Sequence, residues 1–584
     1  MPLNSEQKHY IKKNLQTQSP QQMADDLDIP EKEITNYLKK QWRPEKYQKY
    51  MRRFSISPTV ASFSFKNFWA ENKFILVILA LLVIVSYANS LNNALVSDDV
   101  PAIVNTPTIG NFFSYVLTSP LGFVQRLVYF CAFKIGGLNP ILYRLPNIFY
   151  HLGATFSVFL IFYLTAPRTL AIMIATIFAV HPIFSESVTW ISGNPYSQQG
   201  FLFLLFFAFY ILSKQKPRLF YVSFFIFLMS VSAMPRGAIA LLAIFLYEWF
   251  WGNLREAWKK MLPFFIVSGA VAISLLSQIS FRITALKDTY YLNPGMDSLF
   301  VKIPTSVFSY FHLLVWPDKL SLYQTEMVFT PWEYRFTILI FLIYVGAIIY
   351  FYKKNKFLSF WLTFFILPLA PTLTPMRIAW AVAERYAYLS ALGIIVIIAY
   401  IFYKLSEYKK FKMAVYMLLW LVIAALSIRT ITRNTDWKNE ETLWFATVKT
   451  SPSGSTIHNN LGNVYFQKGN YDKAIEEFGM AIKINPAYGD AYHNLGNTYY
   501  HIQRMPEAAE NYRKALEFNP RLWQSHQNLA AIYYGQGRYD LAYDEIKKAL
   551  EINSGDENLK KNKILIEESL PSMGALSNTP PPNN

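Results

Sequence analysis

The apolar residues of this chain stand in long blocks, and not in the stripes that mark amphipathic helices. The first block, residues 74–88, reaches with its flanks the roughly 17–25 residues that a helix needs to cross the hydrocarbon core of a bilayer. Ten further blocks follow, at residues 145–165, 168–184, 198–213, 218–234, 237–251, 261–280, 335–352, 357–374, 386–403 and 412–429. Hydrophobic residues make up 53% of the 584 residues, and charged residues only 16%. The sequence therefore predicts an all-α, polytopic membrane protein with about eleven spans.

Lysine and arginine outnumber aspartate and glutamate by 55 to 38, which in a soluble protein would suggest nucleic acid binding. Here the basic residues gather in alternate short connections, the pattern of cytosolic loops. These are Arg168; Lys214, Lys216 and Arg218; Arg255, Lys259 and Lys260; Lys353, Lys354 and Lys356; and Lys404, Lys409, Lys410 and Lys412. We expect a cytosolic N-terminus and, with an odd span count, a C-terminal part outside the cytosol. The apolar segment 303–316 is too short for a span and is expected to be re-entrant or interfacial.

Residues 1–67 are polar and are expected to form a cytosolic helical region. Within them, residues 21–38 resemble a helix-turn-helix. Its predicted small core consists of Ala24, Leu27, Ile29, Ile34 and Leu38. DNA binding is one interpretation, but a small helical domain or a protein contact is favoured, and we expect no nucleic acid partner.

Downstream of the last apolar block, the sequence repeats itself with a period of 34 residues. The residues in register are Leu461, Leu495 and Leu529; Tyr465, Tyr499 and Tyr533; Ala474, Ala508 and Ala542; and Ala481, Ala515 and Ala549. This is the tetratricopeptide pattern. We predict a soluble α-solenoid over residues 433–568, with three full repeats and a preceding half repeat whose helix spans 439–449. Residues 569–584 are expected to be a disordered tail.

Two adjacent carboxylates, Asp98 and Asp99, open the first long outer connection. One of them has the chemistry of a general base for an acceptor hydroxyl, or it orients a leaving group through a metal. The alternative is a solvated pair that caps a helix. Whether a divalent metal takes part is not decided by the sequence.

Two more polar groups are predicted on the same outer side. His181 and Glu186 lie at the end of one apolar block, where ionisable groups are costly unless they are paired or functional. Glu384 and Arg385 lie before another block, preceded by Arg377. Because a guanidinium matches phosphate oxygens in a bidentate geometry, this group is a candidate phosphate site, and its alternative is a structural Glu-Arg pair.

Taken in order, several short motifs identify a resemblance. They are Ser97-Asp98-Asp99; Gly137-Leu138-Asn139-Pro140 followed by Asn147 and His151; His181-Pro182-Ile183 through Glu186 to Trp190; Trp316-Pro317 with Leu320 and Tyr323; Ala383 to Leu389; and Arg433-Asn434 with Trp437. Over roughly residues 70–555 the sequence resembles the membrane O-mannosyltransferases that carry tetratricopeptide repeats, a branch of the GT-C glycosyltransferases. The resemblance implies a GT-C-type transmembrane domain, which we assign to residues 68–432.

The resemblance also implies an activity: transfer of a sugar from a polyprenyl-phosphate carrier, with inversion, to an acceptor outside the cytosol. Asp98 would then be the catalytic base, with Asp99 supporting it. The implied donor and phosphate residues are Arg385, Glu384, His181, Glu186 and Arg377. The polyprenyl-phosphate sugar is a substrate, and no tightly bound cofactor is expected.

The chain departs from the family pattern at three places. Residues 193–196 replace an arginine and an acidic residue, and residues 233–236 replace a Ser-Lys-Glu stretch. The first long loop lacks a Tyr-Arg-Pro, which leaves Arg126 as a stand-in. These changes bear on sugar identity and donor geometry.

An asparagine precedes the first-helix leucine of each repeat: Asn460, Asn494 and Asn528. A carboxamide donates and accepts, so this row is predicted to pair with an extended peptide backbone. The alternative is that asparagine is simply common at this repeat position.

The sequence as a whole favours an integral membrane glycosyltransferase of a bacterial cytoplasmic membrane, with its repeats in the periplasm presenting a protein acceptor at serine or threonine. One alternative is glycosylation of an envelope lipid or polysaccharide. Another is a non-enzymatic membrane scaffold that uses its repeats to organise partners.

Overall fold

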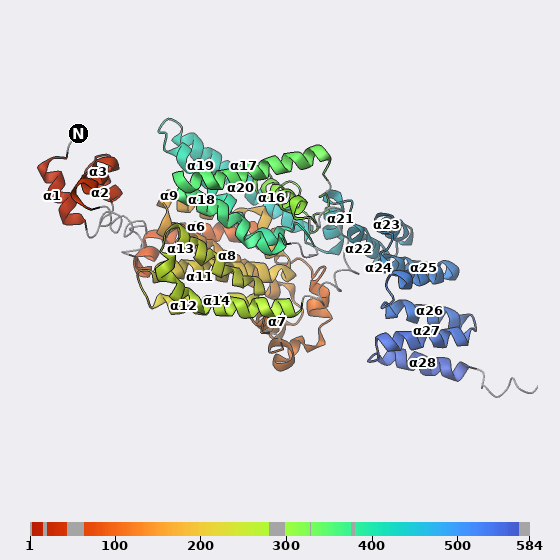
Figure 1. Cartoon of the computed structure of the whole chain (residues 1–584). Coiled ribbons are helices and arrows are strands. Elements are labelled where there is room, and N and C mark those ends of the chain that lie inside the picture. Colours follow the sequence, from red (N-terminus) through yellow and green to blue (C-terminus); the bar gives the residue numbers. More distant parts are fainter. Residues whose placement is uncertain are drawn as a thin grey trace, which may run out of the picture. The chain divides into compact units, whose positions relative to one another are not determined.

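The computed structural model describes residues 3–15, 20–43, 63–118, 120–278, 298–327, 329–374 and 380–570. Within these ranges the regular elements are helices, and no strand is present (Figure 1). The prediction of an all-α chain is confirmed. Arg377 and nearly all of the predicted tail lie outside the described residues. The chain forms two compact units, the first ending at Asn439 and the second containing Tyr323–Val328 and the chain from Glu440 onward.

The N-terminal region contains three short helices, α1 (Ser5–Asn14), α2 (Pro20–Asp26) and α3 (Glu31–Gln41). Their buried core consists of Leu3, Ile11, Met23, Ala24, Ile34 and Leu38. Leu27 and Ile29 pack against it and are partly buried. The sequence thus located three of these six buried residues, but it missed Leu3, Ile11 and Met23.

Seven helices of the described residues are long and apolar enough to cross a membrane, or eight if one bent pair forms a single span. The seven are α6 (Phe65–Tyr87), α8 (Pro140–Thr165), α11 (Asn194–Ser213), α14 (Leu254–Ser277), α17 (Pro331–Lys354), α19 (Ala387–Ser406) and α20 (Lys412–Asp436). The bent pair joins α9 (Arg168–Val180) to Pro182–Thr189 at 48°.

Four further apolar helices are shorter: α12 (Leu219–Ala233), α13 (Ala240–Phe250), α16 (Leu299–Val315) and α18 (Lys356–Ile366). Within the described residues, each of the eleven predicted blocks overlaps one of these helices. Because only seven or eight meet the length and composition of a span, the count of eleven stays a prediction. The same is true of the re-entrant assignment of α16.

The apolar helices divide into an inner and an outer group. About two thirds of each of α8, α11 and α19 is buried (61%, 72% and 67%), whereas α6, α14, α17 and α20 are 11–22% buried. Exposed apolar surface of that extent is suited to lipid. The inner helices therefore form the protein core, and the polar motifs lie at their ends.

The second unit is built of helical hairpins (Figure 1). Its helices are α21 (Glu440–Thr450), α22 (Ser455–Gln467), α23 (Tyr471–Ile484), α24 (Gly489–His501), α25 (Met505–Phe518), α26 (Trp523–Gly535), α27 (Tyr539–Ile552) and α28 (Glu557–Ser569). All six in-register alanines are fully buried. The predicted half-repeat helix corresponds to α21, and α28 covers the last repeat with Leu559 and Ile566.

Candidate functional site

The acidic dipeptide lies in a tightly held loop after α6. Ser97 adopts a left-handed conformation, with φ of 54°, which is uncommon for a residue other than glycine. Asp99 is fully buried, and its Oδ1 accepts hydrogen bonds from the backbone N–H and the hydroxyl of Ser192 at 2.7 and 2.6 Å. Its Oδ2 accepts from the N–H of Val96 at 3.2 Å. Asp99 thus fastens the loop to the turn that precedes α11.

The two carboxylates differ in their surroundings. Asp98 is exposed, and no hydrogen bond or ion pair holds its carboxylate within the described part of the chain. Partial loss of hydration raises the pKa of Asp98, and the Arg385 guanidinium opposes that shift. Burial raises the pKa of Asp99 to about 6, even though its hydrogen bonds with Ser192 and Val96 act in the other direction. Asp98 is the carboxylate that is open to a substrate, and Asp99 is the one that holds the loop.

The predicted Glu-Arg groups form two buried ion pairs. Glu186 accepts from the backbone N–H of Arg385 at 2.7 Å and also from its guanidinium. Glu384 pairs instead with Arg433, its Oε1 lying 3.0 Å from Nη2. The structure thereby joins the motif near Glu186 to the motif at the start of α19.

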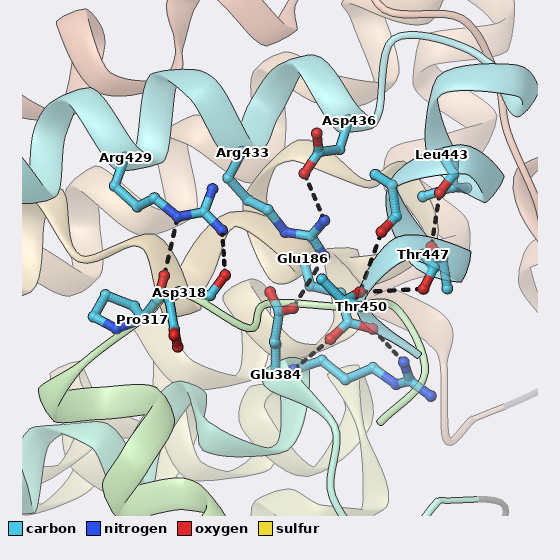
Figure 2. A network of polar contacts seen from close by, with 12 residues as sticks. Glu186, Pro317, Asp318, Glu384, Arg429, Arg433, Asp436, Leu443, Thr447 and Thr450 are labelled. Carbon is cyan, nitrogen blue, oxygen red and sulfur yellow. Dashed lines mark hydrogen bonds and ion pairs between the residues drawn. The ribbon is translucent and has the colours of Figure 1, made fainter. Parts of the chain in front are cut away.

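Helix α20 contributes two arginines to this network, as Figure 2 shows. Arg433 lies between Glu384 and Asp436, and its Nη1 is 2.8 Å from the Asp436 carboxylate. One turn earlier, Arg429 donates to the carbonyls of Pro317 and Asp318 at 3.0 and 3.2 Å. The ends of α16 and α20 are therefore tied together beside the site.

Two indoles lie between the ion pairs. The rings of Trp190 and Trp437 stack with centroids 5.5 Å apart. The guanidinium of Arg385 lies 5.7 Å from the Trp190 ring, and that of Arg433 lies 5.7 Å from the Trp437 ring. Cation–π contacts with a desolvated indole favour both cations.

His181 is buried at the bend between α9 and the turn Pro182–Phe184. One ring nitrogen accepts from the N–H of Ile183 at 3.2 Å, and the other lies 2.9 Å from the carbonyl of Leu314. Both nitrogens therefore bond within the fold and stabilise the bend. Its predicted contact with the donor stays a prediction.

One residue that the sequence analysis did not single out organises the acidic loop. Arg144, in the first turns of α8, is fully buried and donates to four carbonyls. They are those of Thr189 (2.7 Å), Asn93 (2.7 Å), Leu91 (3.1 Å) and Ala94 (3.0 Å). The signal available in the sequence was an arginine near the start of an apolar helix, four residues after Pro140.

The other motifs of the resemblance converge in the same region. Asn147 donates to the carbonyl of Trp190 at 3.0 Å, and His151 pairs with the hydroxyl of Tyr388 at 2.9 Å. Asn434 accepts from the Thr189 hydroxyl at 2.6 Å. Arg126 is bonded locally, to the carbonyl of Tyr115 and the hydroxyl of Thr118.

The repeat asparagines bond between repeats. Asn494 donates to the side chain of Asn459 at 2.9 Å, and Asn528 donates to that of Asn497 at 2.9 Å. Asn460 is half-buried in the first repeat. Two of the three carboxamides thus stabilise neighbouring repeats, and capture of a peptide backbone stays a prediction.

Family models confirm the repeats. A model described as "TPR repeat" matches residues 462–503, and models described as "Tetratricopeptide repeat" match residues 489–522 and 524–556. Among solved structures, a crystal structure of MamA is 20% identical and covers 24% of this chain and 82% of its own, with a TM-score of 0.22. That similarity is too weak to inform the fold.

Curated relatives cover the membrane part as well. "Protein O-mannosyl-transferase TMTC3" of Homo sapiens is 24% identical over 460 residues, which is 68% of this chain and 50% of the relative. "Protein O-mannosyl-transferase F38B6.6" of Caenorhabditis elegans is 25% identical over 445 residues, 70% of this chain and 62% of the relative. The chain therefore spans only about half to three fifths of the length of these relatives. The predicted resemblance to membrane O-mannosyltransferases that carry tetratricopeptide repeats is confirmed.

Proposed function

We propose that this chain is an integral membrane glycosyltransferase that moves a mannose-like hexose from a polyprenyl phosphate to a serine or threonine hydroxyl of a protein. The observation that carries the proposal is the difference in environment between Asp98 and Asp99. The buried Asp99 holds the loop by three hydrogen bonds. Asp98 is left exposed and lies within the electrostatic reach of Arg385. The names of the relatives support the reaction class.

The proposed reaction is a single displacement. Asp98 accepts the proton of the acceptor hydroxyl as the oxygen attacks the anomeric carbon. The bond between that carbon and the phosphate oxygen breaks, and the phosphate leaves with the electron pair. Attack opposite the leaving group inverts the anomeric centre. The guanidinium groups of the arginines in the site stabilise the negative charge that develops on the phosphate.

The apolar helices support a location in a bilayer, where the carrier lipid also resides. The site is proposed to open outside the cytosol, at a bacterial cytoplasmic membrane with the repeats in the periplasm. This orientation follows from the basic clusters in alternate connections.

The test is Asp98→Asn in the purified protein, assayed with a polyprenyl-phosphate mannose and a peptide acceptor. Loss of a general base is expected to lower turnover by about 10²–10⁴-fold. The unfolding temperature should be unchanged, because no hydrogen bond holds this carboxylate among the described residues. Asp472→Asn, an acidic residue in the first turn of α23, is the matched control. Unchanged turnover in Asp98→Asn would favour the membrane scaffold.

A second candidate acceptor is an envelope lipid or polysaccharide. It is favoured if the repeat asparagines are not available to bind a peptide backbone. Because Asn494 and Asn528 donate to neighbouring repeats, their carboxamides are partly committed. The test compares Asn460→Ala with the wild type in the rate of sugar transfer to a peptide acceptor and to a lipid acceptor. If the repeats capture a peptide backbone, transfer to peptide alone should fall. If Asn460→Ala transfers the sugar to both acceptors at the wild-type rate, this residue has no role in peptide capture.

A further inference from the structure

A small pocket adjoins the Glu186–Arg385 pair. It is lined by two arginines, Arg236 and Arg385, and by the rings of Tyr196, Tyr386 and Tyr388, among others. Its volume is about 20 Å³, little more than a single water molecule needs. A whole hexose therefore does not fit in the pocket.

The two arginines differ in whether a carboxylate compensates their positive charge. The Arg385 guanidinium and backbone N–H both bond to the buried Glu186 carboxylate. That carboxylate compensates its charge. A buried cation whose donors already meet a carboxylate has less attraction left for another anion.

Arg236 has no such partner. Within the described residues, no hydrogen bond or carboxylate engages its guanidinium. Instead it lies over the ring of Tyr386, 4.4 Å from the centroid, and 5.7 Å from the ring of Tyr196. Arg385 lies 5.2 Å from the same Tyr386 ring. Tyr386 thus lies near two guanidinium groups, only one of which is neutralised.

The place of Arg236 in the chain indicates that its unpaired charge has a function. It lies in the turn Pro235–Ile239, directly after the apolar helix α12, and it is half-buried. An unpaired cation at the end of an apolar helix is costly and marks a functional position by default. A phosphate supplies the negative charge and the pair of acceptor oxygens that the planar guanidinium fork binds in a bidentate geometry.

We propose that Arg236, and not Arg385, is the principal binding group for the phosphate of the lipid-linked donor. The phosphate binds to the Arg236 guanidinium beside the Tyr386 ring, while Arg385 remains on Glu186 and contributes a weaker, longer-range attraction. This inference rests on the proposed function for the identity of the lipid, and on the geometry alone for the anion.

The test measures binding to the full-length protein in phosphatidylcholine nanodiscs. The probes are a long-chain polyprenyl monophosphate, phosphatidic acid and inorganic phosphate. Arg236→Gln should weaken binding of the polyprenyl monophosphate about tenfold or more, the loss typical of a hydrogen bond to a charged group. Arg236→Lys should lose less, because it keeps the charge. Arg218→Gln, at the exposed opposite end of α12, is the matched control and should bind as the wild type does.

The outcomes separate this inference from the proposed function. Equal binding by Arg236→Gln and the wild type would overturn the inference. So would phosphatidic acid binding as tightly as the polyprenyl monophosphate, since the pocket would then be a general headgroup site. A third outcome is Arg236-dependent binding of inorganic phosphate without binding of the polyprenyl monophosphate. It would support an anion site at Arg236 but contradict its assignment to the lipid-linked donor. If the Gln variant does not fold, Arg236→Lys is compared with Arg218→Lys: weaker binding of the polyprenyl monophosphate by Arg236→Lys alone supports the inference, and equal binding by the two variants overturns it.

Discussion

At the scale of single residues, two neighbours with the same chemistry have opposite environments. Asp99 is fully buried among hydrogen-bond donors, whereas Asp98 is exposed. Ser97, which directly precedes the pair, has a left-handed backbone conformation. Backbone strain of this kind persists where the surrounding structure fixes it, and here Arg144 and Asp99 do so.

Arg144 is expected to position the acidic loop without touching substrate. Arg144→Lys should lower the unfolding temperature and the transfer rate together, since an ammonium cannot reach four carbonyls. Each buried carbonyl left without a donor costs about 1–3 kcal/mol, and those of Thr189 and Asn93 are buried. Thermal unfolding in detergent measures the effect.

Arg126→Lys is the control for this change, because Arg126, a half-buried residue of helix α7 (Phe123–Gly136), bonds to only one carbonyl and one hydroxyl. It should shift the unfolding temperature less. Equal shifts in the two variants would show that Arg144 has no special role in the loop.

Sequence reasoning found the residues that stand in motifs and missed those that do not. The predicted motif residues Glu186, Glu384 and Arg385 do meet in space. Their pairing, with each glutamate bound to an arginine of a different motif, depends on contacts between distant segments and is invisible in the sequence. Arg236 stands in the sequence only as a departure from a family pattern, and its place over the Tyr386 ring depends on a contact between segments far apart in the chain.

At the scale of elements, the repeats were predictable because their packing recurs every 34 residues. The spans were less predictable. A block such as 237–251 is divided between a turn and the eleven-residue helix α13, since Pro235 and Gly237 shape the chain before it. Hydropathy locates apolar segments, but tertiary packing decides where each helix begins.

The turn within each repeat gives a test of backbone strain. Gly469 and Gly537 are left-handed, with φ of 72°, and the middle repeat has Gln503 at the same position with φ of 63°. A side chain in this conformation costs about 1–2 kcal/mol. Gln503→Gly should therefore stabilise the repeats by about 1 kcal/mol, as measured by urea unfolding.

The reverse change is the matched control. Nothing lies within 4 Å of a Cβ added at Gly469, so Gly469→Gln should destabilise the repeats through backbone strain alone. If both substitutions change stability in the same direction, strain at this turn is not the cause.

A buried histidine makes the stability of the repeats depend on pH. His458 lies 2.7 Å from Glu477 and 2.9 Å from the carbonyl of Pro452. Burial disfavours its charge, but these partners outweigh that effect and raise the pKa of His458 above 6.5. The stabilisation is thus fully present below pH 6.5 and is lost as the pH rises through the raised pKa.

The unfolding temperature of the repeats should accordingly fall as the pH rises above 6.5. Glu477→Gln should remove most of this slope, because a neutral amide favours the charged imidazole less. A slope that is unaffected by Glu477→Gln would contradict the role assigned to His458.

At the scale of the whole molecule, the membrane topology decides which residues share a compartment with the substrate. The chain has a single cysteine, Cys131, which is exposed on helix α7 (Phe123–Gly136) in the first long connection. In right-side-out vesicles, a membrane-impermeant maleimide should label Cys131 without detergent, because this connection is predicted to lie outside the cytosol.

Two further positions, each in a Cys131→Ser background, test the span count. Lys409→Cys lies in a predicted cytosolic loop and should be labelled only after detergent is added. Ser554→Cys lies on the exposed surface of the repeats and should be labelled from outside. If Ser554→Cys is protected while Cys131 is labelled, an even number of spans separates the cytosolic N-terminus from the repeats. The eleven-span prediction would then be wrong, and the repeats could not present an acceptor to Asp98.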